Sequence, residues 1–194
     1  MSFRIEEKFI INSFQFFEFK NYLLEKKAIN IFHKRKIISL YFDNSNYQMY
    51  YDSVEGSLPR KKIRLRNYQN KKNYFEFKIS STEGRFKTSH LITQKKFDEI
   101  KNIGILDNLY GSCKPLLFVE YNREYFEFKD IRVTIDNDIN YFSYHRKFLG
   151  DEKDIVVELK APFKKSINEL MTDFPFPRSR FSKYCNGVEK LLIK

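Results

Sequence analysis

The stretch Leu58–Tyr68, LPRKKIRLRNY, carries the most information about the fold. In a strand, alternate side chains point to opposite faces. One face of this stretch would then carry four cations: Arg60, Lys62, Arg64 and Arg66. The opposite face would carry Lys61, Ile63 and Leu65. Four like charges on one face repel each other unless water or an anion lies between them. The face is therefore either solvated or built to hold a multiply negative ligand.

The composition predicts one ordered, strand-rich domain. A chain of 194 residues can bury a real core, so we expect a single domain over residues 1–194. Aromatic residues make up 18% of it, with 21 Phe and 13 Tyr, which is too many for a disordered chain and favours strands.

The net charge of +11 indicates an anionic partner. Nucleic acid, polyphosphate, a nucleotide and an acidic membrane surface all meet that description. The chain is rich in Lys, Asn, Ile and Phe throughout, so the positions of arginine are more informative than the number of lysines.

Cysteine usage and hydropathy predict a cytoplasmic protein. Cys113 and Cys185 are far apart and have no metal-ligand spacing, so we expect both to be reduced. The start, MSFRIEEKF, lacks the apolar run of a signal peptide. No apolar segment approaches the roughly 20 residues that cross a bilayer, so no membrane span is expected.

Hydrophobic periodicity predicts a mainly antiparallel α+β fold. Alternation predicts strands at about 3–11, 37–43, 60–68, 74–80, 85–87, 116–128, 131–139 and 154–161. Capping residues and apolar spacing predict helices at about 14–26, 94–103, 167–173 and 182–193. Tyr47–Asp52 is expected to be strand or turn. Lys34–Lys36 is expected to be a solvated loop, with the guidance of anions to the mouth of a tunnel as the alternative.

Charged faces recur from strand to strand. A sheet with one wet side would explain any single strand. However, mixed-sign pairs two residues apart occur three times: Glu6/Lys8, Glu76/Lys78 and Glu158/Lys160. If the sheet closes into a barrel, these faces could line it, with the helices packed outside. A charged lumen suits a chain of phosphates with a divalent metal, because Arg and Lys hold phosphate oxygens and carboxylates hold the ion.

Eight short motifs follow one another along the chain. They are R-x-E-x-K (4–8), S-L-Y-F-D (39–43), K-I-R-x-R (62–66), F-E-F-K (75–78), Y-x-R (121–123), R-V-T-I-D (132–136), E-L-K (158–160) and F-S-K-Y (181–184). Together they resemble the VTC domain, the polyphosphate polymerase domain of the triphosphate tunnel metalloenzyme superfamily, also called CYTH-like. The resemblance spans almost the whole chain and implies a closed antiparallel barrel, the triphosphate tunnel. The wider superfamily has Glu where this chain has Arg4, which removes one possible metal ligand.

The resemblance also implies roles for individual residues. Catalytic residues that grip the phosphates would be Lys8, Arg64, Arg66, Lys78, Arg123 and Arg132. Arg180 and Lys183 would lie near the growing polyphosphate. Glu158 would hold Mg²⁺ or Mn²⁺, with Glu6 and Glu76 as further candidates. Lys62, Arg85, Lys87, Asp136 and Lys160 would line or brace the tunnel.

The implied activity is metal-dependent phosphoryl transfer, with polyphosphate made from ATP. Two alternatives remain open: hydrolysis of a triphosphate or polyphosphate in the same tunnel, and non-catalytic binding of polyphosphate or inositol phosphates. Expected partners are ATP or another triphosphate and polyphosphate, without nucleic acid. An RNA- or DNA-binding domain would need its basic and aromatic residues on an exposed surface.

Overall fold

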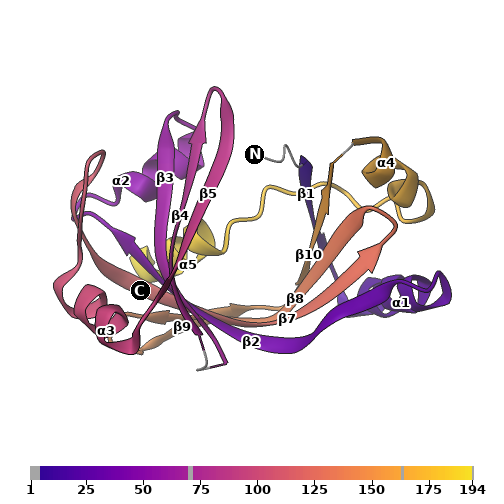
Figure 1. Ribbon diagram of the computed structural model, residues 1–194, viewed down its shortest axis with the longest axis horizontal. Coiled ribbons are helices and arrows are strands. Elements are labelled where there is room, and N and C mark those ends of the chain that lie inside the picture. Colours follow the sequence, from indigo (N-terminus) through magenta and orange to yellow (C-terminus); the bar gives the residue numbers. More distant parts are fainter. Residues whose placement is uncertain (1–4, 70–71, 163, 194) are drawn as a thin grey trace. The chain divides into compact units, whose positions relative to one another are not determined.

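The computed structural model describes residues 5–69, 72–162 and 164–193 (Figure 1). Its strands are β1 (Ile5–Ile11), β2 (Ile29–Asp43), β3 (Arg60–Tyr68), β4 (Lys72–Ser81), β5 (Gly84–Ile92), β6 (Ile105–Asp107), β7 (Gly111–Phe128), β8 (Ile131–Ser143), β9 (Phe148–Glu152) and β10 (Ile155–Ala161). Its helices are α1 (Ser13–Glu25), α2 (Gln48–Glu55), α3 (Gln94–Ile103), α4 (Lys164–Asp173) and α5 (Lys183–Leu192).

The strands form one sheet in the order β1-β10-β8-β7-β2-β3-β4-β5, with β6 paired to β7 and β9 to β8. The pairings with a defined register are antiparallel. The expected α+β fold dominated by antiparallel strands is therefore confirmed. The order begins at β1 and ends at β5, and closure into a barrel stays a prediction.

The chain divides into two compact units. Unit 1 comprises residues 1–36, 121–139 and 151–181, and unit 2 comprises 37–120, 140–150 and 182–194. Strands β2, β7 and β8 each contribute residues to both. A single domain over residues 1–194 stays a prediction, and each unit is described by itself below.

The core of unit 1 lies on the apolar face of β1, β10 and β8. Alternate residues such as Phe9, Val157 and Ile135 are buried there. Helix α1 covers this face with Phe19 and Leu23. The helix begins where predicted, because the side chain of Asn12 accepts from the Gln15 amide and the Gln15 side chain accepts from the Asn12 amide. Helix α4 packs on β10.

The core of unit 2 forms between β2, β3 and the helices beside them. Leu40 pairs in register with Leu65 and Phe42 with Ile63, and all four are buried. Strands β3, β4 and β5 form two successive antiparallel hairpins, which lie side by side in Figure 1.

Asp43 connects three elements of unit 2. Its carboxylate accepts from the amides of Met49 (3.0 Å) and Tyr50 (3.2 Å) at the start of α2, and from the Tyr184 hydroxyl of α5. A carboxylate at a helix N-terminus satisfies amides that have no partner within the helix. Asp43 therefore holds α2 and α5 against the end of β2.

Most predicted elements are confirmed, and two expectations are wrong. Tyr47–Asp52 lies largely in helix α2 because Asp43 and Asn44 cap its first amides, the latter through a 3.0 Å bond to the Gln48 amide. Lys34–Lys36 lies inside β2, which begins at Ile29 rather than near Ile37. In the described part of the chain, no helix is long and apolar enough to cross a bilayer.

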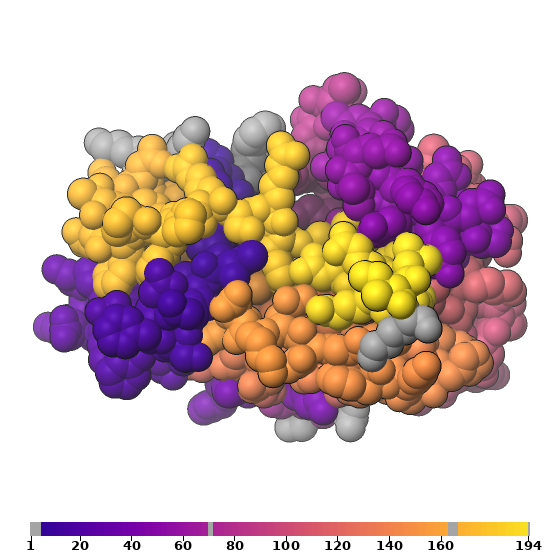
Figure 2. All heavy atoms as spheres, turned by 180° about the vertical axis from the view of Figure 1, so that it is seen from behind, coloured from indigo at the N-terminus to yellow at the C-terminus, as the bar shows by residue number. Residues whose placement is uncertain are grey.

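Helix α5 packs closely on its neighbours because Gly187 has no side chain. Figure 2 shows this helix, in yellow, beside the purple segment of α2 and the orange segments of β8 and β9. A Cβ at Gly187 would lie 2.8 Å from Leu117 Cδ1 and 2.9 Å from Tyr141 Cδ1. Glycine is therefore required at position 187 because α5 lies close to Leu117 and Tyr141, and not because of the backbone angles of this residue.

Replacing Gly187 with Ala should destabilise unit 2. The added methyl overpacks the contact with two buried side chains, which we expect to lower the free energy of unfolding by about 1–3 kcal/mol. Chemical denaturation measures this. Glu189→Ala, on an exposed position of the same helix, is the control and should change stability little. Equal stability of the two variants would contradict the close packing.

Candidate functional site

The charged face of unit 2 is assembled by strand register. Residues paired directly across antiparallel strands point to the same face. Tyr41, Arg64, Glu76 and Ser89 form one such row across β2–β5. Lys62, Lys78 and Lys87 form the next row. Arg66 follows on β3, opposite Ser39 and Tyr74.

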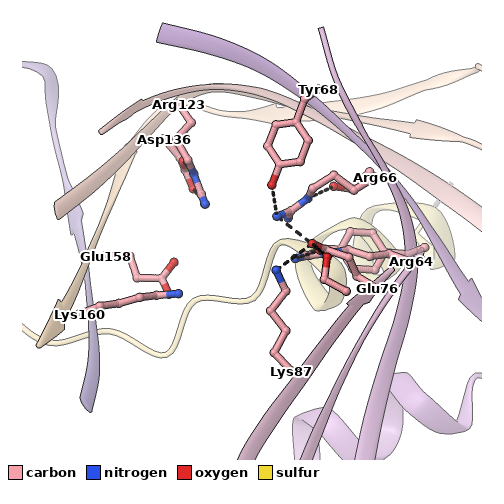
Figure 3. A network of polar contacts seen from close by, with 12 residues as sticks. Arg64, Arg66, Tyr68, Glu76, Lys87, Arg123, Asp136, Glu158 and Lys160 are labelled. Atoms are coloured by element: carbon pink, nitrogen blue, oxygen red, sulfur yellow. Dashed lines mark hydrogen bonds and ion pairs between the residues drawn. The ribbon is translucent and has the colours of Figure 1, made fainter. Parts of the chain in front are cut away.

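Glu76 is the centre of this face (Figure 3). Its carboxylate is 2.7 Å from the Arg64 guanidinium, 2.7 Å from Lys87 Nζ and 3.5 Å from Arg66 Nη1. The Ser89 hydroxyl donates to it at 3.0 Å. The side chain is only 3% exposed, so its charge is neutralised almost entirely by protein cations.

These cations keep Glu76 ionised. Burial by itself would raise the pKa of Glu76, but the positive charges of Arg64, Arg66 and Lys87 outweigh it and hold the pKa well below its ordinary value. Burial also lowers the pKa of Lys87, although Glu76 opposes that shift. Glu76 thus acts as the counter-ion that holds three cations close together.

Lys62 is placed by helix α5. Its ammonium donates to the Ser182 hydroxyl at 2.9 Å, and Ser182 is the residue that caps α5. The ammonium also lies over the Tyr184 ring at 5.6 Å. Burial lowers the pKa of Lys62. Lys183, which opens α5, is half-buried and lies close enough to contribute to the lowered pKa of Tyr41.

The charged face of unit 1 is also set by register. Glu6 pairs with Lys160, Lys8 with Glu158 across β1 and β10, and Lys160 with Arg132 across β10 and β8. Each pair therefore shares a face, opposite the apolar core of this unit. The mixed-sign pairs of the sequence become cross-strand neighbours of opposite charge.

Lys160 lies between two carboxylates. Its ammonium is 3.2 Å from Glu6 Oε1 and 3.2 Å from Glu158 Oε1, so one cation bridges the two carboxylates. Figure 3 shows Lys160 beside Glu158. One or two carboxylates together with substrate phosphates are the usual ligands of Mg²⁺ at phosphate-transfer sites. Glu6 and Glu158 fit that donor set. Glu76 fits it less well, because both its oxygens already accept from cations.

No group of three or more His, Cys, Asp or Glu side chains suited to a metal occurs in the part of the chain that is described. A metal at Glu6 and Glu158 would therefore need ligands from its substrate.

Arg123 is held by Asp136. The guanidinium donates to both carboxylate oxygens, at 2.5 Å from Nε and 2.7 Å from Nη2. Burial would lower the pKa of Arg123, but the Asp136 charge outweighs it and raises the pKa well above its ordinary value. Asp136 is 1% exposed and fixes the orientation of the arginine.

Lys8 contacts the segment that leads to α5. Its ammonium donates to the Phe181 carbonyl at 2.9 Å, and the Ser179 amide donates to the Lys8 carbonyl at 2.8 Å. Arg180, in the same segment, is exposed.

The structure gathers the predicted residues into two sets. Unit 2 brings together Lys62, Arg64, Arg66, Lys78, Lys87 and Glu76. Unit 1 brings together Lys8, Arg132, Lys160, Glu6 and Glu158, with Arg123 and Asp136 paired beside them. Arg85 is exposed, Arg60 donates to the carbonyls of Gly56 and Ser57, and Arg4 lies outside the described residues.

Two tyrosines of the unit 2 face were not singled out from the sequence as site residues. The Tyr41 hydroxyl accepts from Arg64 at 2.9 Å, and the Tyr68 hydroxyl accepts from Arg66 at 3.3 Å. Tyr41 shares the alternation of S-L-Y-F-D with Ser39, which was the available signal. Both phenols support arginines that were predicted to bind phosphate.

A family comparison accounts for this arrangement of strands and cations. The model of the VTC domain matches residues 3–192, nearly the whole chain. The chain belongs to the VTC domain family. None of the curated proteins matches the chain.

Solved structures share the fold of this VTC domain. A candidate adenylate cyclase from Bacillus halodurans is 13% identical, with a TM-score of 0.67 over 94% of this chain and 96% of that one. A candidate adenylyl cyclase from Hippeastrum, described as having a dominant triphosphatase activity, is 14% identical with a TM-score of 0.65 over 96% of each chain. A conserved hypothetical protein from Pyrococcus furiosus is 16% identical, with a TM-score of 0.63 over 94% of this chain and 99% of that one.

Replacing Glu76 with Gln should destabilise this VTC domain in a pH-dependent way. At neutral pH the change leaves the buried Arg66 and the partly exposed Arg64 and Lys87 without their counter-ion, which we expect to lower the free energy of unfolding by about 3 kcal/mol. The folded-state pKa of Glu76 is lowered, so its contribution is present above the unfolded-state pKa of about 4.3 and declines as the pH falls below that value.

Urea denaturation of both proteins at several pH values between neutral and acidic measures this. The difference in free energy of unfolding between the two proteins should shrink as the pH falls below the pKa of a free glutamate. Glu99→Gln, in the exposed pair with Lys96, is the control and should show only a small difference at any pH. A pH-independent difference for Glu76→Gln would rule out the ionic role.

Proposed function

We propose that this VTC domain is a metal-dependent phosphotransferase that acts on a nucleoside triphosphate and makes polyphosphate from ATP. The observation that carries the proposal is the gathering of cations from alternate positions of neighbouring strands on one sheet face of each unit. Membership of the VTC domain family supports it. The proposal includes a closed barrel in which these faces line a tunnel.

The cations would bind and orient the phosphates. Arg64 and Arg66 present planar guanidinium groups that match phosphate oxygens, and Lys62, Lys78 and Lys87 add point charges beside them. In phosphoryl transfer, charge spreads over the oxygens of the transferred group, so catalysis depends mainly on positioning and electrostatic stabilisation. Arg123, Arg132, Lys160 and Lys8 would do the same from unit 1.

A divalent ion, Mn²⁺ or Mg²⁺, would be held by Glu158 and Glu6. It would supply charge neutralisation at the phosphate oxygens. Lys160, which lies between the two carboxylates, neutralises them when no other cation is bound. Arg180 and Lys183 would contact the growing chain, and the protein would work in the cytoplasm, as the sequence predicts.

Hydrolysis is the second candidate function. It is favoured by the shared fold with the Hippeastrum protein, whose description names a triphosphatase activity. The same cations would hold the triphosphate, and water would replace the phosphate chain as the attacking group. A binder of polyphosphate without turnover would use the same faces.

The products formed from ATP separate these candidates. The purified protein is incubated with ATP and Mn²⁺, and the products are resolved on a gel and assayed for free phosphate. We expect long phosphate chains. Free phosphate without chains would indicate the hydrolase, and neither product would leave only the binder.

The metal assignment makes a separate prediction for Glu158→Gln. Loss of the carboxylate should lower turnover at least about tenfold, while binding of tripolyphosphate without metal is retained. Turnover at increasing Mn²⁺ concentrations and calorimetric binding measure the two effects. Glu18→Gln, an exposed position on α1, is the control. Full turnover of Glu158→Gln would remove Glu158 as a metal ligand.

A further inference from the structure

Several side chains gather around the ring of Tyr125 in unit 1. Tyr125 is 3% exposed and lies on β7 two residues beyond Arg123. The guanidinium carbons of Arg35, Arg132 and Arg123 lie 5.5, 5.6 and 6.0 Å from its ring centre. Phe32 meets the same ring edge-on, with centroids 5.3 Å apart. Three cations therefore surround one buried aromatic side chain.

Arg35 contacts two aromatic rings that meet edge-on. Its guanidinium lies 4.2 Å from the Phe32 ring centre as well as over Tyr125. It comes from β2, in the Lys34–Lys36 stretch that the sequence suggested was a solvated loop. The strand instead directs this side chain to the ring beside Arg123 and Arg132.

Of the three arginines around Tyr125, only Arg123 is paired with a carboxylate in the described part of the chain. Arg123 forms a bidentate ion pair with Asp136. Within residues 5–69, 72–162 and 164–193, Arg35 and Arg132 form no ion pair and instead contact aromatic rings. Two cations around one buried ring without a carboxylate repel each other, so the arrangement favours an anion.

A cation–π contact does not use the N–H donors of either arginine. A ring face attracts the flat face of a guanidinium, and the N–H groups lie at the edge of that plane. They remain able to donate to a ligand in the same plane. The geometry matches a phosphate, whose oxygens accept two parallel N–H bonds from one arginine.

We propose that Arg35 and Arg132, held over Tyr125, form a binding subsite for one phosphate group of a phosphoanhydride chain. Arg35 thereby extends the set of phosphate-binding residues beyond those that the family resemblance implied. The inference rests on the proposed function, because it takes the same class of anion as substrate. A nucleobase is not the ligand, since Arg35 already covers a face of Phe32, the partly exposed ring that a base would need.

Binding of inorganic tripolyphosphate, of long-chain polyphosphate and of ATP, by calorimetry without metal, tests the proposal. Arg35→Ala should weaken the affinity for the phosphate chains about tenfold or more, because a charge-assisted contact is lost. In turnover, the same variant should raise KM more than it lowers kcat. Lys26→Ala is the matched control: it also removes one charge that lies over a ring, here that of Tyr22 at 5.6 Å, but at the C-terminal end of α1.

These binding measurements distinguish failure of the subsite from failure of the proposed function. If the unchanged protein binds neither inorganic chain, the proposed function fails. If it binds them and Arg35→Ala binds equally well, only the subsite is overturned. A loss of affinity for ATP alone, with the affinity for both inorganic chains unchanged, would also overturn it, since that pattern would indicate contact with the nucleobase.

A second variant tests the role of the rings. Phe32→Leu keeps both arginines but removes the partly exposed ring on which Arg35 stacks. We expect a severalfold weaker affinity for tripolyphosphate and a small loss of stability, because the edge-on contact with Tyr125 is also removed. Unchanged affinity of this variant would show that the stack does not position Arg35.

Discussion

The buried carboxylate of Glu76 is the interaction on which the charged face of unit 2 depends. Two arginines and a lysine can lie together beside buried strands only because one anion neutralises them from a central position. The arginines are thereby held in place before any ligand arrives. Under the proposed function, a bound phosphate would share these donors with Glu76.

Unit 1 neutralises its cations by several means at once. Arg123 is paired with one carboxylate, and Lys160 with two carboxylates on neighbouring strands. Lys8 donates to a backbone carbonyl. Arg35 and Arg132 contact aromatic rings. The more strongly a cation is neutralised within the protein, the less free it is to bind a ligand. A cation over a ring gives up nothing when an anion binds, whereas a cation paired with a carboxylate must be shared.

Much of this site was predictable because strands alternate strictly. The positions of Arg64, Arg66 and Glu76 on one face follow from period two alone, and register then brings Lys87 to Glu76. The helix at Gln48–Glu55 was missed because its start depends on amide contacts with Asp43 and Asn44, which periodicity does not report. Arg35 was missed because the rings that hold it come from β2 and from β7, about ninety positions later.

The hydrogen bond between Asp43 and Tyr184 has a consequence for how the protein is made. It joins residues 141 positions apart, and helix α5 completes the core around Gly187. Contacts of such long sequence separation form slowly, because a large loop must close before they contribute. Unit 2 cannot finish folding until α5 has left the ribosome, so β3–β5 are synthesised long before their last packing partner.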